Sequence, residues 1–217
     1  MPIPLMGEAK GVADMQTVGV RATGQTRPAR TFWWDREPPV EADILRAVIF
    51  DADSALADIE RDGDITPQDG LVDTVMSLFV AGIWVGVVST RPRVWAETLV
   101  RQLIGDGLIE TIVTVEDLPE IHAGSQCDAE LYRLALWEMG ITRRNALAIA
   151  GSGRGMRAAV SAELPAVVVT TGYTADHQFR GAAEVRAGYD GANPLLAAGC
   201  QQAHRRWWIA KQRCRVA

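Results

Sequence analysis

Lysine is almost absent from this sequence of 217 residues, in which only Lys10 and Lys211 are lysines among 22 basic side chains. From residue 11 to residue 210, arginine is therefore the only permanently cationic residue type. The arginine guanidinium is a flat fork, and it does not freely replace the ammonium point charge of lysine. We expect that no site formed within this interval can use a lysine.

Other scarcities exclude several classes of protein. No apolar run reaches the roughly 18–20 residues that span a bilayer, and the N-terminal stretch lacks the pattern of a secretory signal. The three cysteines are odd in number and widely spaced, which predicts free thiols in a reducing compartment. A net charge of −5 disfavours a general nucleic-acid binder. We predict a cytoplasmic protein without a membrane or nucleic-acid partner, and its oligomeric state stays open.

The sequence pattern divides the chain into three parts. Residues 1–45 are predicted to be an irregular leader, whose aromatic residues 32–34 pack on the chain's own core. Residues 46–197 alternate regularly between strand and helix patterns, and residues 198–217 form a basic C-terminal helix. We expect that helix to dock through Trp207 and Trp208 and to leave its basic side chains in solvent. A partner-binding role for either end is the alternative.

Strand and helix patterns alternate from residue 46 onward. The predicted strands are 46–50, 83–89, 110–115, 145–150 and 165–171, and the predicted helices between them are 66–82, 92–107, 128–141 and 155–164. Thr66 is the predicted N-cap of the first helix, Pro67 suits its first turn and Gly82 its end. This alternation predicts an α/β fold, a doubly wound, mostly parallel Rossmann-like sheet of about five strands.

Polar side chains follow several of these strands, and ligands of doubly wound sheets bind at the carboxyl ends of the strands. The residues expected there are Asp51, Asp53, Ser54, Ser89, Thr90, Arg91, Glu116, Asp117 and the loop 151–155. Asp51 and Asp53 are two residues apart in an extended segment, so they point to the same side. At neutral pH two such carboxylates repel each other unless a cation lies beside them.

Residues 46–197 resemble the haloacid dehalogenase (HAD) superfamily, chiefly its phosphatase and phosphoglucomutase-like members. The resemblance rests on four stretches in the family's order: AVIFDADS at 47–54, VVST at 87–90, CDAELYRLALWEMGI at 127–141 and ALAIAGSGRGMRAAVSAELPAVVV at 146–169. It implies a HAD-like core. Because the segment between Asp53 and Ser89 is short, we expect no large cap domain.

The resemblance also implies roles for the polar residues. Asp51 matches the nucleophile that attacks phosphorus, and Asp53 matches the general acid and base. Ser89, followed by Thr90, matches the hydroxyl that holds the transferring phosphate. In the family a lysine offsets the negative charge, and acids after the fourth strand hold Mg²⁺ together with the first aspartate. Mg²⁺ is therefore the implied cofactor, with Asp51 and Asp53 as candidate ligands here.

The chain departs from the family pattern at the groups that balance charge. Gln126 stands where the family has its lysine, and Gly151 and Gly155 stand where it has acids. Each loss of this kind typically slows a reaction by about 10²–10³. An uncapped site is also open to water, which weakens charge interactions. We predict a protein of phosphoaspartyl-phosphatase ancestry with impaired or lost catalysis and a weakened Mg²⁺ site.

Two alternatives stay open. An active Mg²⁺-dependent phosphohydrolase requires a rearranged metal site that combines Asp51 with another carboxylate. The candidates are Glu116, Asp117, Asp58, Asp62 and Asp64. A non-enzymatic phosphate-binding, nucleotide-binding or scaffold protein would use the open pocket or the ends of the chain. The expected partner is a phosphorylated small molecule or protein.

The glycine-rich loop 151–155 opens a predicted helix, and such a helix N-terminus attracts anions. Ser152 and Arg154 are therefore candidate phosphate-binding residues. A dinucleotide-binding fingerprint fits poorly, because its third glycine would fall at Met156. A serine-hydrolase interpretation is also weak, because Ser152 lacks a G-x-S-x-G context and a marked histidine partner. We expect Ser152 to cap the helix.

Overall fold

The computed structural model describes residues 44–59, 65–105, 107–119 and 127–216. Its centre is a six-stranded sheet in the order β5-β4-β1-β6-β7-β8, in which every pair of neighbours is parallel. The strands are β1 (Ala47–Asp51), β4 (Trp84–Ser89), β5 (Thr111–Thr114), β6 (Ala146–Ala150), β7 (Ala166–Val169) and β8 (Glu184–Arg186).

The predicted doubly wound α/β sheet is confirmed, and the strand count is corrected from about five to six. The missed strand is β8, at the edge of the sheet. Its three residues, EVR, include two charged side chains and no apolar run, so nothing in the local pattern indicates a strand. Pairing with β7 is what makes this segment extended.

The order of the strands reverses beside β1. The chain places β4 and β5 on one side of β1, and it places β6, β7 and β8 on the other side. Doubly wound sheets bind ligands outside the carboxyl ends of the strands at such a reversal. Asp51 is the last residue of β1, so the topology puts this carboxylate at the expected ligand position.

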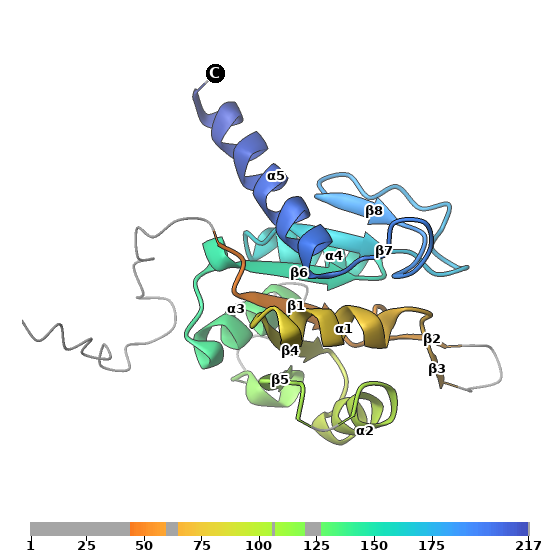
Figure 1. The fold of residues 1–217 in the computed structure, drawn as a ribbon. Coiled ribbons are helices and arrows are strands. Elements are labelled where there is room, and N and C mark those ends of the chain that lie inside the picture. Colours follow the sequence, from red (N-terminus) through yellow and green to blue (C-terminus); the bar gives the residue numbers. More distant parts are fainter. Residues whose placement is uncertain (1–43, 60–64, 106, 120–126, 217) are drawn as a thin grey trace, which may run out of the picture. The chain divides into compact units, whose positions relative to one another are not determined.

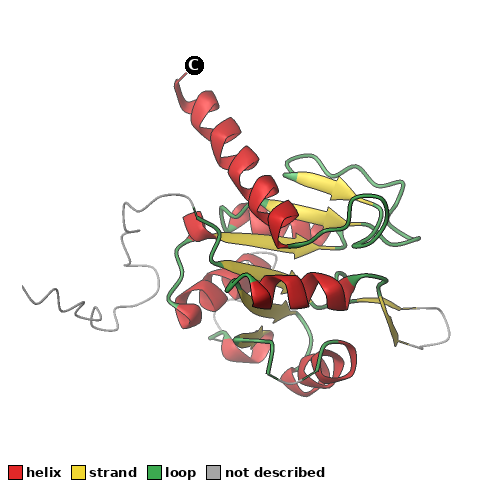
Figure 2. Ribbon diagram, in the orientation of Figure 1, coloured by secondary structure: helices red, strands yellow, loops and turns green. Residues whose placement is uncertain are grey.

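Helices cover both faces of the sheet (Figures 1 and 2). They are α1 (Leu71–Val80), α2 (Arg93–Leu103), α3 (Cys127–Met139), α4 (Gly153–Ser161) and α5 (Ala197–Val216). Alternate residues of a strand point to opposite faces. Phe50 accordingly joins the core under α1, α2 and α5, whereas Ile49 joins the core under α3 and α4. Apolar burial on both faces holds β1 rigidly in the middle of the sheet.

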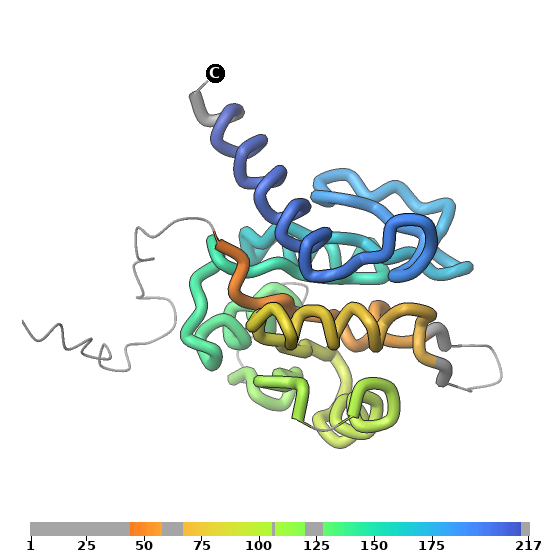
Figure 3. The backbone as a smooth tube through the Cα atoms, viewed as in Figure 1, coloured from red at the N-terminus to blue at the C-terminus, as the bar shows by residue number. Residues whose placement is uncertain are grey.

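A small antiparallel hairpin of β2 (Ala57–Ile59) and β3 (Ile65–Pro67) follows β1 (Figure 1), and the chain then continues into α1 (Figure 3). Between β1 and β4, the structure describes only this hairpin and α1, with no large cap. The prediction of Thr66 as a helix N-cap is wrong, because Thr66 lies in β3. Helix α1 starts after Gly70, whose φ of 80° is left-handed and favours glycine. Gly82, with φ of 69°, follows the end of α1 as predicted.

Helix α5 packs on the core through its first turns. The N–H of Ala197 donates to the hydroxyl of Ser77 on α1 at 2.9 Å, and Cys200 is fully buried. Trp208 is buried, and the ammonium of Lys211 lies 4.4 Å from the ring centroid of the partly buried Trp207. Within the described ranges, every helix is too short or too polar to traverse a lipid bilayer.

Some predictions lie outside the described residues. They include nearly all of the leader 1–45, with its aromatic residues 32–34, and Gln126. The division of the chain into three parts stays a prediction.

A buried hydrogen bond offers a test of how the fold holds the loop after β1. The hydroxyl of Tyr189, which is fully buried, donates to the carbonyl oxygen of Ala55 at 2.6 Å. Tyr189→Phe leaves that carbonyl without its donor, so we expect the free energy of unfolding to fall by about 1–3 kcal/mol. Urea unfolding followed by circular dichroism measures the change. Tyr173→Phe, at an exposed position, is the control, and an equal loss in both variants would contradict the role of the bond.

Candidate active site

Asp51 ends β1 in a buried position, with only 7% of its surface exposed. Its Oδ1 accepts the backbone N–H of Asp53 at 3.1 Å, and its Oδ2 accepts the hydroxyl of Ser54 at 2.7 Å. The chain turns at once, because the N–H of Ala55 donates to the carbonyl oxygen of Asp51 at 2.8 Å. This turn folds Ser54 back over the carboxylate.

The Asp51 carboxyl is a much weaker acid than an exposed aspartate. Burial is the main cause that raises its pKa to about 7, and the negative charge of Asp53 adds to the rise. Hydrogen bonds from Ser54 and from the backbone of Asp53 oppose the rise, and the charge of Asp128 adds a smaller contribution. Near neutral pH, a proton on Asp51 therefore relieves much of the repulsion between the two acids.

Asp53 is held by the residues at the end of β4. Its Oδ1 accepts the hydroxyl of Ser89 at 2.6 Å, and its Oδ2 accepts the N–H and the hydroxyl of Thr90 at 2.9 and 2.5 Å. The structure therefore brings the predicted phosphate-binding hydroxyls together with the predicted acid–base residue. In this arrangement both hydroxyls donate to Asp53, so neutral donors stabilise this carboxylate.

Gly151 and Gly155 allow an unusually close approach beside Asp51. The N–H of Gly151 donates to the hydroxyl of Ser54 at 3.0 Å, so one serine links the ends of β1 and β6. A Cβ atom at position 151 would lie 1.8 Å from the carbonyl oxygen of Ser54. A Cβ atom at position 155 would lie 2.0 Å from Oδ2 of Asp51. The loop after β1 packs closely here because Gly151 lacks a side chain, and the Asp51 carboxylate lies against α4 because Gly155 lacks one.

The first turn of α4 carries the other two predicted phosphate-binding residues. The Ser152 hydroxyl accepts the N–H of Gly155 at 3.1 Å, which is the expected N-cap. Arg154 forms a two-point ion pair with Asp128 on α3, with Nε–Oδ2 at 2.5 Å and Nη2–Oδ1 at 2.9 Å. Within the described ranges, no arginine forms an ion pair with Asp51.

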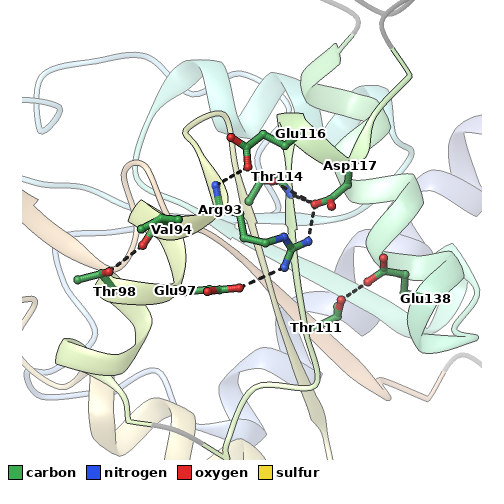
Figure 4. Close-up of polar contacts among 9 residues, drawn as sticks. All are labelled: Arg93, Val94, Glu97, Thr98, Thr111, Thr114, Glu116, Asp117 and Glu138. Carbon is green, nitrogen blue, oxygen red and sulfur yellow. Dashed lines mark hydrogen bonds and ion pairs between the residues drawn. The ribbon is translucent and has the colours of Figure 1, made fainter.

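Glu116 and Asp117 follow β5, and their contacts run to the start of α2 (Figure 4). In the 3₁₀ turn η2 (Val115–Asp117), Asp117 accepts the Arg93 Nη2 at 2.6 Å and the Thr114 N–H at 2.7 Å. The backbone N–H of Arg93 donates to Glu116 at 3.1 Å. Burial by itself would raise the pKa of Asp117, but the bonds from Arg93 and Thr114 leave that pKa lowered. These contacts tie β5 to α2, and none of them reaches Asp51.

Two polar residues near the acids were missed by reasoning from the sequence, and both lie in the first turns of α3. Asp128 holds Arg154, as described above. Tyr132 is 2% exposed, and its hydroxyl has no hydrogen-bond partner among the described residues. Burial, and then the charges of Asp51, Asp53 and Asp128, raise its pKa, so Tyr132 stays a neutral donor. The signal was their place in the stretch CDAELY, which the sequence analysis used for the resemblance and for a helix but not as a source of site residues.

Comparison with known proteins identifies the family of the chain. No protein-family model matches it. The protein CbbY of Cereibacter sphaeroides is 30% identical over 196 residues, which cover 79% of this chain and 85% of that protein. The chain belongs to the haloacid dehalogenase-like (HAD-like) hydrolase superfamily. Within it, the relationship to CbbY places the chain in the HAD-like phosphatase family.

Solved structures of HAD-like proteins share the fold. The crystal structure of CbbY from Rhodobacter sphaeroides in complex with phosphate has a TM-score of 0.62 and 20% identity, and the match covers 72% of this chain and 99% of that one. A HAD-like hydrolase from Bacteroides fragilis has a TM-score of 0.58 and 17% identity, with 66% and 97% covered. At these identities the likeness shows a common fold.

HAD-like phosphatases typically use Mg²⁺, an ion that prefers oxygen ligands. In the described part of the chain, no group of three or more histidine, cysteine, aspartate or glutamate side chains is placed to hold a metal ion. Gly151 offers no side-chain ligand, and Asp53 is engaged by Ser89 and Thr90. The described residues thus do not fit a centre of three carboxylates. The side chain of Asp58 and all of Asp62 and Asp64 lie outside the described residues.

The raised pKa of Asp51 predicts that stability falls as the pH increases. The folded state holds a proton up to about pH 7, whereas the unfolded state releases it near 3.8, so ionisation between these values favours unfolding. Asp51→Asn removes that ionisation, and we expect its melting temperature to exceed that of the parent by more at pH 8 than at pH 5. Thermal melts in EDTA measure this.

The control is Asp176→Asn, which removes an exposed carboxylate. It should show no comparable gain at either pH. A gain for Asp51→Asn that is equal at both pH values would contradict the raised pKa.

The contact between Gly151 and Ser54 predicts that the family's acid cannot simply be restored. Gly151→Asp places a Cβ atom against the Ser54 carbonyl, so we expect a loss of stability of about 1–3 kcal/mol or more, without a gain of Mg²⁺-dependent phosphatase activity. Urea unfolding and turnover of p-nitrophenyl phosphate measure the two effects. Gly172→Ala, at a position where an added Cβ meets no atom within 4 Å, is the control. A stable Gly151→Asp variant that Mg²⁺ activates would contradict this prediction, because it would show that the loop around Ser54 moves at little cost in stability.

Proposed function

We propose that this HAD-like protein binds phosphate monoesters in the Asp51 pocket and transfers the phosphoryl group very slowly or not at all. The observation that carries the proposal is the closure of Ser54 onto Gly151. This contact fills the position at which the family resemblance expects an acid that binds Mg²⁺. Under the proposal, the pocket keeps the family's shape but binds Mg²⁺ weakly.

The chemistry expected of the family shows what the pocket lacks. An oxygen of Asp51 attacks phosphorus while the bond from phosphorus to the ester oxygen breaks, and the departing oxygen takes a proton from Asp53. Water then attacks the phosphorus of the aspartyl-phosphate and gives a proton back to Asp53. The bond between phosphorus and Asp51 breaks, and phosphate leaves. The first step requires an ionised Asp51, and both steps require an Asp53 that can exchange a proton.

Each of these requirements is opposed by a contact in the structure. A pKa of about 7 leaves a large share of Asp51 protonated at neutral pH, and the Ser54 hydroxyl occupies its Oδ2. Asp53 accepts three hydrogen bonds from Ser89 and Thr90. The loss of one charge-stabilising group typically slows a reaction by about 10²–10³. Because such losses within one site are not additive, the total is not their product.

The ligand class follows from the relatives and from the donors around the pocket. CbbY has been solved with phosphate and, as a mutant, with Xylulose-(1,5)bisphosphate. We therefore propose a phosphorylated small molecule as the ligand, with a phosphoprotein as the alternative for an uncapped pocket. Ser89, Thr90, Ser152 and Arg154 are the proposed phosphate-binding residues, and the first two would turn their hydroxyls from Asp53 to the phosphate. The cytoplasmic location stays a prediction.

Turnover of p-nitrophenyl phosphate tests the proposal. We expect the parent protein to show no more turnover than Asp51→Asn, in either excess Mg²⁺ or EDTA. In a parallel measurement, inorganic phosphate added to the parent protein in EDTA should raise its melting temperature, because a ligand that binds only the folded state stabilises it.

Two results would contradict the proposal. Mg²⁺-dependent turnover that disappears in Asp51→Asn would establish an active phosphohydrolase with a rearranged metal site. If the parent protein neither hydrolyses p-nitrophenyl phosphate nor gains melting temperature when phosphate is added, it has no phosphate site.

A further inference from the structure

The ion pair between Arg154 and Asp128 joins the first turns of α4 and α3 beside the acids. Asp128 is mostly buried, with 12% of its side chain exposed, whereas 67% of the Arg154 side chain is exposed. The pair uses the Nε and Nη2 groups of the guanidinium. An arginine offers five N–H donors, so the exposed guanidinium keeps donors that find no acceptor among the described residues.

The electrostatic surroundings show where this guanidinium lies. The pKa of Arg154 is raised mainly by its hydrogen bond to Asp128 and by the charge of Asp128, against a small opposing effect of burial. The charges of Asp53 and Asp51 also contribute to the rise, so the cation lies within electrostatic range of both acids. The geometry agrees, because a Cβ atom at Gly155, the next residue along α4, would lie 2.0 Å from Oδ2 of Asp51, so Arg154 stands on the turn of α4 that borders the pocket.

Arg91, the other arginine that the sequence analysis considered beside the acids, is engaged elsewhere. Its guanidinium lies 4.4 Å from the ring centroid of Trp95. This cation–π contact joins the loop before α2 to the first turn of that helix. A weakly hydrated arginine stacked on an aromatic ring is not placed as a counter-charge for Asp51. Arg154 is therefore the better-placed cation of the two.

A second donor on the same side of the sheet also lacks a partner. The Tyr132 hydroxyl is buried, has no hydrogen-bond partner among the described residues, and lies in the field of the same acids. A buried hydroxyl without an acceptor is costly, which indicates that a water or ligand oxygen completes this site. The first turns of α3 and α4 thus offer donors to an anion, whereas Gly151 offers no side-chain ligand to a cation.

We propose that Arg154, held in place by Asp128, is the cation that binds phosphate in this pocket without Mg²⁺. The inference rests on the proposed function, because it concerns the same pocket. A guanidinium suits this role, since its remaining donors match the oxygens of a phosphate group. Asp128 acts as a positioning residue that orients the guanidinium of Arg154. The competing explanation is that the pair only links α3 to α4.

Titration with inorganic phosphate in EDTA, followed by isothermal calorimetry, tests the proposal. We expect Arg154→Gln to weaken phosphate binding at least tenfold, Arg154→Lys to weaken it less, and Asp128→Asn to weaken it several-fold. Arg157→Gln is the matched control, because Arg157 is exposed and lies one turn later on α4. It should bind phosphate as the parent does, and added Mg²⁺ should leave the affinity of the parent unchanged.

The outcomes separate this inference from the function on which it rests. If the parent binds phosphate and Arg154→Gln binds it equally well, the pair is structural and the inference fails while the proposed function stands. If the parent binds no phosphate, both fail. Phosphate affinity that appears only with Mg²⁺ also overturns the inference. Arg154→Gln leaves the mostly buried Asp128 without its cation and should lower the melting temperature, so the affinities are compared at a temperature at which every ligand-free variant is folded.

Discussion

The contact between Ser54 and Gly151 is the constraint on which the site depends. One serine hydroxyl donates to Asp51 and accepts from Gly151, and the serine carbonyl occupies the space that a side chain at position 151 would need. The loop after β1 is thereby packed against the end of β6. At the family position that resemblance assigns to a metal-binding acid, any side chain would require the Ser54 backbone to move.

Among the described residues, the two acids are surrounded by neutral hydrogen-bond donors, and no arginine forms an ion pair with Asp51. Asp53 is stabilised by the hydroxyls of Ser89 and Thr90 and by one backbone N–H. Asp51 is buried beside it, and burial together with the charge of Asp53 favours its protonated form. Under the proposed function, this pocket receives a further negative charge with the help of Arg154.

Much of the fold was predictable, because long apolar strands and glycine-terminated helices carry strong local signals. The position of Asp51 at the strand-order reversal followed from that fold. The failures have a common cause. Strand β8 and the β2–β3 hairpin are short, and pairing rather than local propensity forms them. Thr66 looked like an N-cap because Pro67 follows it, yet both residues belong to the hairpin.

The sequence by itself determined which groups the site can contain: two acids, several hydroxyls, no lysine, and glycines where acids are expected. Only the tertiary structure decided how these groups are used. In that structure, Glu116 and Asp117 accept hydrogen bonds from Arg93. Arg154 pairs with Asp128. The Tyr132 hydroxyl has no hydrogen-bond partner among the described residues. These outcomes depend on distances between elements remote in the chain, and a difference of one Cβ atom at Gly151 decides whether the loop can close.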